Sequence, residues 1–260
     1  MNLLTPNSYL LTPNSNMTNP QHLLLTEDGS HSVLHPELHE TYHSIHGAIQ
    51  ESEHTFINAG LRQCNQSSLH ILEIGFGTGL NAFLSLIETE QSQQKVFYTA
   101  VELYPLSLEA AAALNYPDLI AKDKKEIFYF LHSSPCQNSI PLTKNFELHK
   151  IQEDFTKLRL TGTYDLVYFD AFSPEKQPEM WKEDRFQMIY DCCNPGAILT
   201  TYCAKGAVRR ALQTAGFFVE RIPGAKGKRE MLRAKKEAVS KVNQHTDDTD
   251  ETDESGFDIC

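Results

Sequence analysis

The chain has 260 residues, of which 40% are hydrophobic and 22% are charged, and its formal net charge is −11. This length suits one large α/β domain with small additions, and the ordinary composition excludes collagen-like, coiled-coil and wholly disordered proteins. Taken as an average, the negative charge also argues against a nucleic-acid partner.

Residues 1–21 are rich in Asn, Thr, Pro and Ser and are expected to form a flexible leader. They lack the basic and apolar regions of a signal peptide, and no uncharged apolar run in the chain reaches the roughly 18 residues that a membrane span requires. The six cysteines include no CxxC pair. The sequence therefore predicts a cytoplasmic protein with reduced thiols.

Residues 22–68 are expected to form a small extension on the substrate side of the main domain. Asp28-Gly29 is a turn pair between apolar residues 23–25 and 33–34, which predicts a hairpin. An apolar-periodic helix is predicted near 47–61. Six histidines lie between positions 31 and 54, but their spacing matches no compact metal site, so no metal is expected.

From residue 69 onward, strands alternate with helices. Such alternation is typical of a doubly wound α/β domain with a parallel sheet. The predicted strands are 69–74, 96–102, 146–151, 165–170, 196–203 and 216–222, and the predicted helices are 80–90, 105–115, 117–132, 177–193 and 205–215. Residues 22–236 are expected to form the domain, followed by an acidic, disordered tail at 237–260.

The sharpest motif is Glu73-Ile74-Gly75-Phe76-Gly77-Thr78-Gly79-Leu80-Asn81, between a predicted strand and a predicted helix. Alternate glycines let the backbone turn sharply and approach a ligand closely. The GxGxG spacing differs from the GxGxxG of dehydrogenases. Glu73 would repel a pyrophosphate but would suit the ammonium group of S-adenosylmethionine (AdoMet). A bound dinucleotide and a tight turn without a ligand are the alternatives.

Three further acids follow predicted strands, at the edge where open α/β sheets bind their ligands. Glu102 is placed to accept both hydroxyls of a ribose. Asp154 is placed to accept from an adenine amino group, or else to cap a helix. Asp170 precedes an apolar lip made by Phe172 and Pro174, and it is expected to orient a nucleophile or take its proton. A purely capping role is the alternative for Asp170.

The net charge conceals a basic band. Residues 205–236 hold ten Lys or Arg against two Glu, for a net charge of +8, whereas residues 237–260 hold one Lys against eight acids, for −7. Clustered cations are typical of phosphate binding, although a solvated basic face or pairing with the acidic tail would give the same pattern. The candidate RNA contacts, on a helix and in a loop at the far edge of the sheet, are Lys205, Arg209, Lys226, Lys228 and Arg229.

Four blocks of this sequence resemble the methyltransferase domain of the MnmC family, whose members finish 5-methylaminomethyl-2-thiouridine at the wobble position of tRNA. The blocks are the segment with Tyr42, Ser44, Gly47 and Glu51; the glycine loop 75–81; Asp170-Ala171-Phe172-Ser173-Pro174 with Pro178-Glu179-Met180-Trp181; and residues 224–231. The resemblance covers roughly residues 22–235, in order.

This resemblance implies a class I methyltransferase fold, Rossmann-like, with a mostly parallel seven-stranded sheet and helices on both faces. It also implies AdoMet as the donor and the amine of 5-aminomethyl(-2-thio)uridine, at position 34 in the anticodon loop of tRNA, as the acceptor. Asp170 would face that amine. The candidate AdoMet contacts are Glu73, Gly75, Gly77, Gly79, Asn81, Glu102 and Asp154. The candidate substrate contacts, besides the basic residues, are Tyr42, Glu51, Phe172 and Pro174.

Two departures from the family pattern and one difference in length accompany the resemblance. Ala171 stands where the family often has Gly, and His43 stands where an aromatic residue is usual. Many relatives carry a second, FAD-dependent oxidase domain, and nothing after residue 236 is expected to form one. One fold serves many acceptors, so an N-methyltransferase for a small-molecule or protein amine is the alternative, and a non-catalytic AdoMet- or RNA-binding module is a second.

Overall fold

The computed structural model describes residues 22–238. The predicted leader and nearly all of the predicted acidic tail lie outside the described residues.

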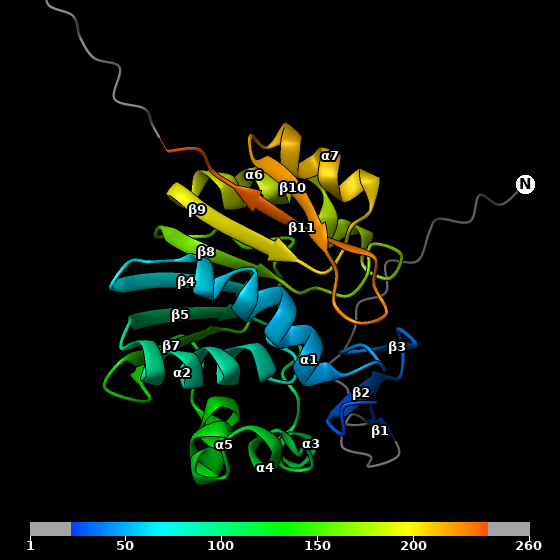
Figure 1. Cartoon of the computed structure of the whole chain (residues 1–260), viewed down its shortest axis with the longest axis vertical. Coiled ribbons are helices and arrows are strands. Elements are labelled where there is room, and N and C mark those ends of the chain that lie inside the picture. The colour runs from blue at the N-terminus through cyan, green and yellow to red at the C-terminus, as the bar shows by residue number, and fades with distance from the viewer. Residues whose placement is uncertain (1–21, 239–260) are drawn as a thin grey trace, which may run out of the picture.

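A twisted eight-stranded sheet forms the centre of the described chain (Figure 1). In spatial order the strands are β10 (Phe218–Pro223), β11 (Glu230–Lys235), β9 (Cys193–Thr201), β8 (Tyr164–Phe169), β4 (Ser68–Ile74), β5 (Lys95–Val101), β7 (Phe146–Ile151) and β6 (Ser139–Pro141). The strands from β9 to β7 pair in parallel. The pairs at both edges are antiparallel. The mostly parallel sheet expected from the sequence is therefore confirmed.

Two strands of the sheet are absent from the prediction. The sheet has eight strands rather than seven because β6 adds to β7, and three residues are too few to show a strand pattern. β11 is also absent from the predicted strands. Its charged residues Glu230, Arg233 and Lys235 are interspersed with the buried Met231, Leu232 and Ala234. Because of those charges, this segment was counted as part of the basic band.

Helices cover both faces of the sheet (Figure 1). On one face, α2 (Leu80–Ser92) and α5 (Lys125–Ser133) contribute Phe83 and Phe128 to a core that includes Ile71 of β4. On the other face, α6 (Glu183–Asp191) and α7 (Gly206–Thr214) contribute Phe186 and Leu212 to a second core around Phe169 of β8. Side chains at the carboxyl ends of the central strands therefore lie between the two helical layers that pack on the sheet.

Three of the predicted long helices are shorter or divided. The segment 105–115 holds only α3 (Leu108–Ala112), and 117–132 is divided into α4 (Tyr116–Ile120), a 3-10 turn and α5. Ala121 is extended between α4 and the 3-10 turn, so the helical hydrogen bonds of α4 stop there. The segment 177–193 starts as a 3-10 turn, Pro178–Trp181, and α6 begins only after the extended Lys182.

The N-terminal extension forms a separate three-stranded sheet of β1 (Leu23–Leu25), β2 (His31–His35) and β3 (Glu40–Thr41). Leu23 pairs with Val33, so the predicted hairpin is confirmed. Its turn also starts α1 (Ala48–Ser52), because Ser30 Oγ accepts from the backbone N–H of Ala48 and Asp28 Oδ2 accepts from that of Gln50. A π-helical turn, Glu53–Asn58, continues α1 toward the sheet.

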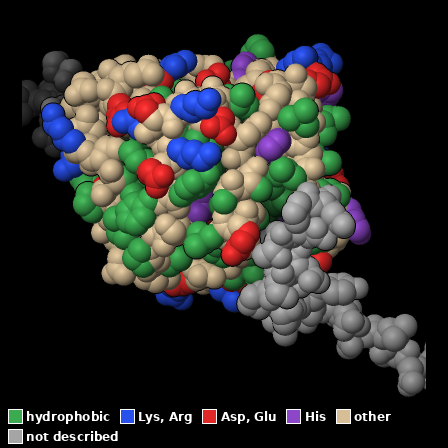
Figure 2. Space-filling view, turned by 90° about the horizontal axis from the view of Figure 1, so that it is seen from below, with side chains coloured by type: hydrophobic (Ala, Val, Ile, Leu, Met, Phe, Trp, Pro, Cys, Tyr) green, Lys and Arg blue, Asp and Glu red, His purple; other side chains and the backbone are tan. Residues whose placement is uncertain are grey.

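Charged and apolar side chains are interspersed on the face seen in Figure 2. Leu108, Leu119 and Phe130, on the short helices α3 and α4 and on α5, are among the exposed apolar side chains. Within residues 22–238, no helix has the length and apolar character needed to cross a membrane. The same residues contain no group of three or more His, Cys, Asp or Glu side chains placed to hold a metal ion.

Candidate active site

A pocket of about 580 Å³ lies at the carboxyl ends of β4, β5 and β8, beneath the N-terminal extension. This is the edge at which open α/β sheets bind their ligands, and the volume is in the range of small-molecule sites. The glycine loop and the ends of the parallel strands form one side of the pocket. The extension, the segment after β8 and a single lysine from the β10–β11 loop form the other.

The glycine loop passes between two fixed neighbours. Gly75 has φ +92°, and a Cβ there would lie 2.5 Å from the carbonyl oxygen of Asp170. A Cβ on Gly77, where φ is +49°, would lie 2.8 Å from Cδ1 of Tyr42. Only glycine adopts these conformations at these distances without strain. The loop is therefore held close to both neighbours, and residues 75–78 line the pocket.

Asn81, in the first turn of α2, joins two carboxyl groups. Its Nδ2 donates to Glu73 Oε1 at 3.0 Å and to Asp170 Oδ2 at 2.8 Å. Glu73 is fully buried, and burial raises its pKa well above the usual value. Glu73 lies behind the pocket lining, whereas Asn81 is part of it. Glu73 Oε2 and Asn81 Oδ1 have no hydrogen-bond partner among residues 22–238.

Asp170 follows β8 and faces the pocket. Burial raises the pKa of its carboxyl group to about 7, against the opposing effect of the hydrogen bond from Asn81. Glu51 adds to the rise and Lys228 reduces it. Because the carboxyl group titrates near neutral pH, it can exchange a proton with a bound nucleophile under those conditions.

The other two strand-end acids are held by local hydrogen bonds. Glu102 accepts from the backbone N–H groups of Gly77 at 3.0 Å and Tyr104 at 2.9 Å, and burial raises its pKa against these bonds. Asp154 accepts from the backbone N–H and hydroxyl of Thr156, and it pairs with Lys157. Burial alone would raise the pKa of Asp154, but these contacts leave it lowered. Asp154 thus has the turn-capping geometry of its alternative interpretation while also lining the pocket.

Aromatic rings line the other side of the pocket. The Tyr42 and Phe172 rings meet edge to face with centroids 5.0 Å apart, and the His35 ring lies 5.3 Å from Phe172. Trp181 is a core residue whose Nε1 donates to the carbonyl of Phe172 at 2.8 Å. The apolar lip expected from the sequence is therefore Phe172 together with Tyr42. Pro174 is absent from the pocket lining.

The candidate RNA contacts do not form one free cationic cluster. Lys205 pairs with Glu175, and Lys226 Nζ lies 3.0 Å from Glu27 Oε2. Lys228 alone of the five candidates lines the pocket. Arg229 is exposed and Arg209 is partly buried. The loop between β10 and β11 does lie at the far edge of the sheet, as expected. It also packs against the N-terminal extension, which brings Glu27 and Glu51 to its lysines.

The structure adds residues that the motif search did not select. Tyr202, just after β9, lines the pocket, and its hydroxyl donates to the carbonyl of Ala171 at 2.9 Å. Its position after a parallel strand is the signal that would have found it. His43 Nε2 lies 2.6 Å from Thr78 Oγ1, and burial lowers the pKa of His43 to about 4. A neutral His43 therefore ties the extension to the glycine loop.

Known proteins resemble this chain along most of its length. A sequence profile described as S-adenosyl-L-methionine-dependent methyltransferase matches residues 128–237. The chain is 29% identical over 248 residues to the tRNA 5-methylaminomethyl-2-thiouridine biosynthesis bifunctional protein MnmC of Cupriavidus metallidurans, which covers 89% of this chain and 36% of that protein. A protein of the same name from Leptospira borgpetersenii is 31% identical over 215 residues, covering 75% of this chain and 32% of its own length.

The crystal structure of MNMC2 from Aquifex aeolicus matches with a TM-score of 0.67 and 25% identity, covering 84% of this chain and 70% of that one. The chain belongs to the MnmC methyltransferase family. The family membership and the class I fold expected from the sequence are confirmed. The chain spans about one third of the length of the curated MnmC proteins it matches.

The family uses AdoMet, and the pocket fits that molecule. Asn81 Oδ1, on a residue of the pocket lining, is a buried acceptor without a hydrogen-bond partner among the described residues, and such an atom is costly unless a ligand or water satisfies it. The ammonium group of AdoMet has only donors to offer. The side chains beside the glycine loop are acidic, which suits a cation and disfavours the phosphates of a dinucleotide.

Proposed function

We propose that this protein transfers a methyl group from AdoMet to the primary amine of 5-aminomethyluridine, or its 2-thio form, at wobble position 34 of tRNA. The observation that carries the proposal is the placement of Asp170 between the glycine loop and the aromatic side of the pocket, held by Asn81. The names of the MnmC relatives support tRNA as the substrate. An amine acceptor needs a neighbouring group of this kind, because alkylamines are mostly protonated at neutral pH.

The candidate AdoMet contacts and the two aromatic side chains of the lip have a place in this proposal. Glu102 would accept hydrogen bonds from a ribose, and the backbone of residues 75–79 would lie under the bound donor. Asn81 Oδ1, backed by Glu73, would accept from the ammonium group. Asp154 would contact the adenine end. On the acceptor side, Tyr42 and Phe172 would hold the base, because aromatic rings stack on unpaired bases.

AdoMet supplies a methyl group on a sulfonium sulfur, and that sulfur leaves as a thioether when a nitrogen lone pair takes the methyl. Asp170, as the carboxylate, accepts a proton from the substrate ammonium and holds the neutral amine by a hydrogen bond. The new nitrogen–carbon bond forms, and the product is a secondary ammonium. Asn81 keeps the carboxyl group in place throughout, so much of the rate comes from positioning.

We place the reaction at the anticodon loop and in the cytoplasm. A base in an unpaired loop can be splayed out of its stack at low cost, and it would have to leave the stack to enter this pocket. The five cysteines of the described residues are all free thiols, which supports a reducing compartment. Residues 22–236 would act as one methyltransferase unit, with 22–68 as its substrate-side extension.

The test is to incubate the protein with AdoMet and tRNA isolated from cells that lack the final methylation, followed by mass analysis of the digested nucleosides. We expect conversion of the 5-aminomethyl nucleoside to its methylamino form. tRNA that already carries the methylamino form is the control and should gain nothing. A 5-aminomethyl nucleoside that stays unchanged while AdoMet binds would refute the proposal.

A further inference from the structure

The loop between β10 and β11, residues 224–229, is fastened to the N-terminal extension at several points. Lys226 Nζ lies 3.0 Å from Glu27 Oε2, and the ring of His46 packs directly against Gly227. His54 Nε2 lies 2.8 Å from the carbonyl oxygen of Pro223, at the start of the loop. These contacts hold the loop in one place at the pocket edge.

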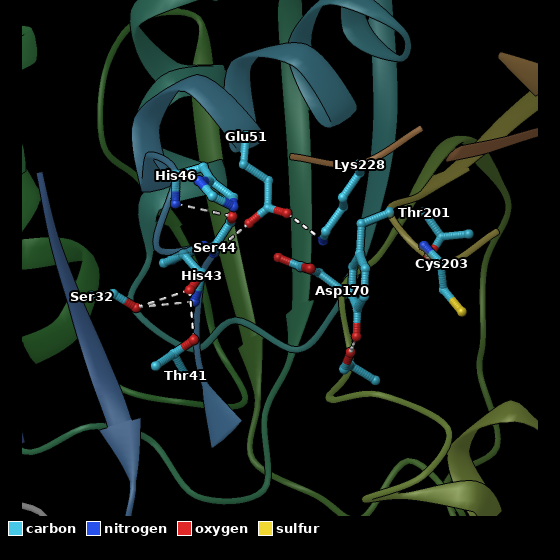
Figure 3. A network of polar contacts seen from close by, with 12 residues as sticks. Ser32, Thr41, His43, Ser44, His46, Glu51, Asp170, Thr201, Cys203 and Lys228 are labelled. Atoms are coloured by element: carbon cyan, nitrogen blue, oxygen red, sulfur yellow. Dashed lines mark hydrogen bonds and ion pairs between the residues drawn. The ribbon is translucent and has the colours of Figure 1, made fainter. Parts of the chain in front are cut away.

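Lys228 extends from this loop into the pocket (Figure 3). Its Nζ lies 2.5 Å from Glu51 Oε1 and 4.1 Å from the centroid of the Tyr202 ring. The other oxygen of Glu51 accepts from the backbone N–H of Ser44 at 2.7 Å. Figure 3 shows the carboxyl group of Asp170 beside this pair. The ammonium group of Lys228 is therefore fixed by an acid and a ring, inside the site and next to Asp170.

We propose that Lys228 is a positioning residue for the methyl transfer, whose ammonium group, held by Glu51, keeps Asp170 ionised toward the substrate amine. This inference rests on the proposed function and gives Lys228 a role different from the phosphate contact that the sequence suggests. A lysine that already faces a carboxylate and an aromatic ring within the pocket has little left to offer a phosphate. A phosphate would also be repelled by Glu51 and Asp170.

The two members of the Lys228–Glu51 pair have opposite electrostatic effects on the carboxyl group of Asp170. The titratable groups that face it are Glu73 from β4, Tyr98 from β5, Glu51 from α1, Tyr202 after β9 and Lys228 from the loop. Lys228 is the cation in this set of described residues. It lowers the pKa of Asp170, whereas Glu51 raises it. Removing one charge or the other should therefore shift Asp170 in opposite directions.

The experiment compares Lys228→Met, Glu51→Gln and the double variant, each of which removes charge with little change in shape. The carboxyl carbons of aspartate are labelled with carbon-13 and titrated by NMR in the protein without ligands, and the Asp170 signal is assigned from its loss in Asp170→Asn. We expect the Asp170 midpoint to rise by about 1 pH unit in Lys228→Met and to fall by about 1 unit in Glu51→Gln. The double variant should lie near the wild type.

The same shifts should appear in catalysis. The acidic limb of the pH profile of kcat should move upward in Lys228→Met and downward in Glu51→Gln, because the carboxylate form is the active one. Lys228→Arg keeps the cation and should keep the wild-type limb. The matched control is Glu27→Gln, which removes the charge that pairs with Lys226 of the same loop and with His46 of the extension but leaves the pocket charges in place. It should move neither the NMR midpoint nor the kinetic limb.

A purely structural pair would behave differently, since breaking it from either side would have the same effect. If both single variants shift Asp170 in the same direction, or neither shifts it, the proposal is overturned. Failure of the proposed function is a separate result. Opposite NMR shifts in a protein that does not methylate tRNA would support the role of Lys228 in setting the charge of Asp170. The missing methylation would leave the tRNA substrate of the proposed function refuted.

Discussion

The two sides of the pocket are built in different ways. The glycine-loop side comes from residues that follow β4, β5, β7 and β8, and its contacts are short hydrogen bonds between neighbouring strand ends, such as Gly77 to Glu102. The acceptor side joins the N-terminal extension to the β10–β11 loop. Its central contact, Glu51 to Lys228, joins residues 177 positions apart.

This difference separates contacts that depend on the sheet and the glycine loop from contacts that depend on two distant segments of this chain. The hydrogen bonds from the backbone N–H groups of Gly77 and Tyr104 to Glu102 join residues at neighbouring strand ends, so they depend on the sheet and the loop alone. The ion pairs of the acceptor side depend on two segments from opposite ends of the chain. Variants on the first side should change AdoMet binding, and variants on the second should change the acceptor step.

The largest effect is expected at the junction of the two sides, with Asp170→Asn. The amide oxygen still accepts from Asn81, but the side chain cannot take a proton. We expect kcat to fall by roughly 100-fold or more, with AdoMet affinity nearly unchanged. Single-turnover methylation and calorimetric titration with AdoMet measure the two quantities. An unchanged kcat would remove Asp170 from the reaction.

A large effect on the glycine-loop side is expected from Gly75→Ala, because its Cβ would meet the backbone of Asp170 at 2.5 Å and its φ is positive. We expect a loss of about 2 kcal/mol in the free energy of unfolding and at least a tenfold weaker affinity for AdoMet. The matched control is Gly196→Ala, which has φ +86° and open space around it. It should lose stability by about 1 kcal/mol and bind AdoMet normally. Equal AdoMet affinity in both variants would contradict the role of the loop.

A smaller effect is expected from Glu102→Gln. The substitution keeps the shape but removes the charge that strengthens hydrogen bonds to a ribose. We expect AdoMet to bind about tenfold more weakly, which corresponds to about 1.4 kcal/mol, while kcat at saturating AdoMet stays close to the wild type. A fall in kcat with unchanged AdoMet affinity would place Glu102 on the acceptor side. That result would contradict the division of the pocket into an AdoMet side and an acceptor side.

The smallest effect is expected from Arg229→Ala, at the outer end of the β10–β11 loop. Arg229 is exposed, so it can meet a phosphate where Lys226 and Lys228 are held by acids. We expect tRNA affinity to fall about threefold and the salt dependence of binding to weaken by about one phosphate contact. Lys144→Ala is the control, because this exposed residue precedes β7, at the opposite edge of the parallel strands. A similar loss of tRNA affinity in Lys144→Ala would show that Arg229 makes no phosphate contact beyond its general positive charge.

Sequence patterns predicted the part of the site that depends on neighbours along the chain. The glycine loop and the acids at 102, 154 and 170 fall at the pocket because parallel strands bring their carboxyl ends to one edge of the sheet. The same reasoning missed β11, because charged residues are interspersed with its three buried apolar residues. It also joined helices that are separated at Ala121 and Lys182, where the backbone is extended.

By itself, the sequence determined the parallel sheet, the glycine loop and the family, because these follow from local periodicity and short motifs. The tertiary structure decided what the basic band does. Glu27 and Glu51 lie far from Lys226 and Lys228 in the sequence, and only the packing of the extension on the β10–β11 loop brings them into contact. A run of basic residues gives the local charge of a sequence. The acidic residues that pair with it in the folded protein decide how much of that charge is free to bind a partner.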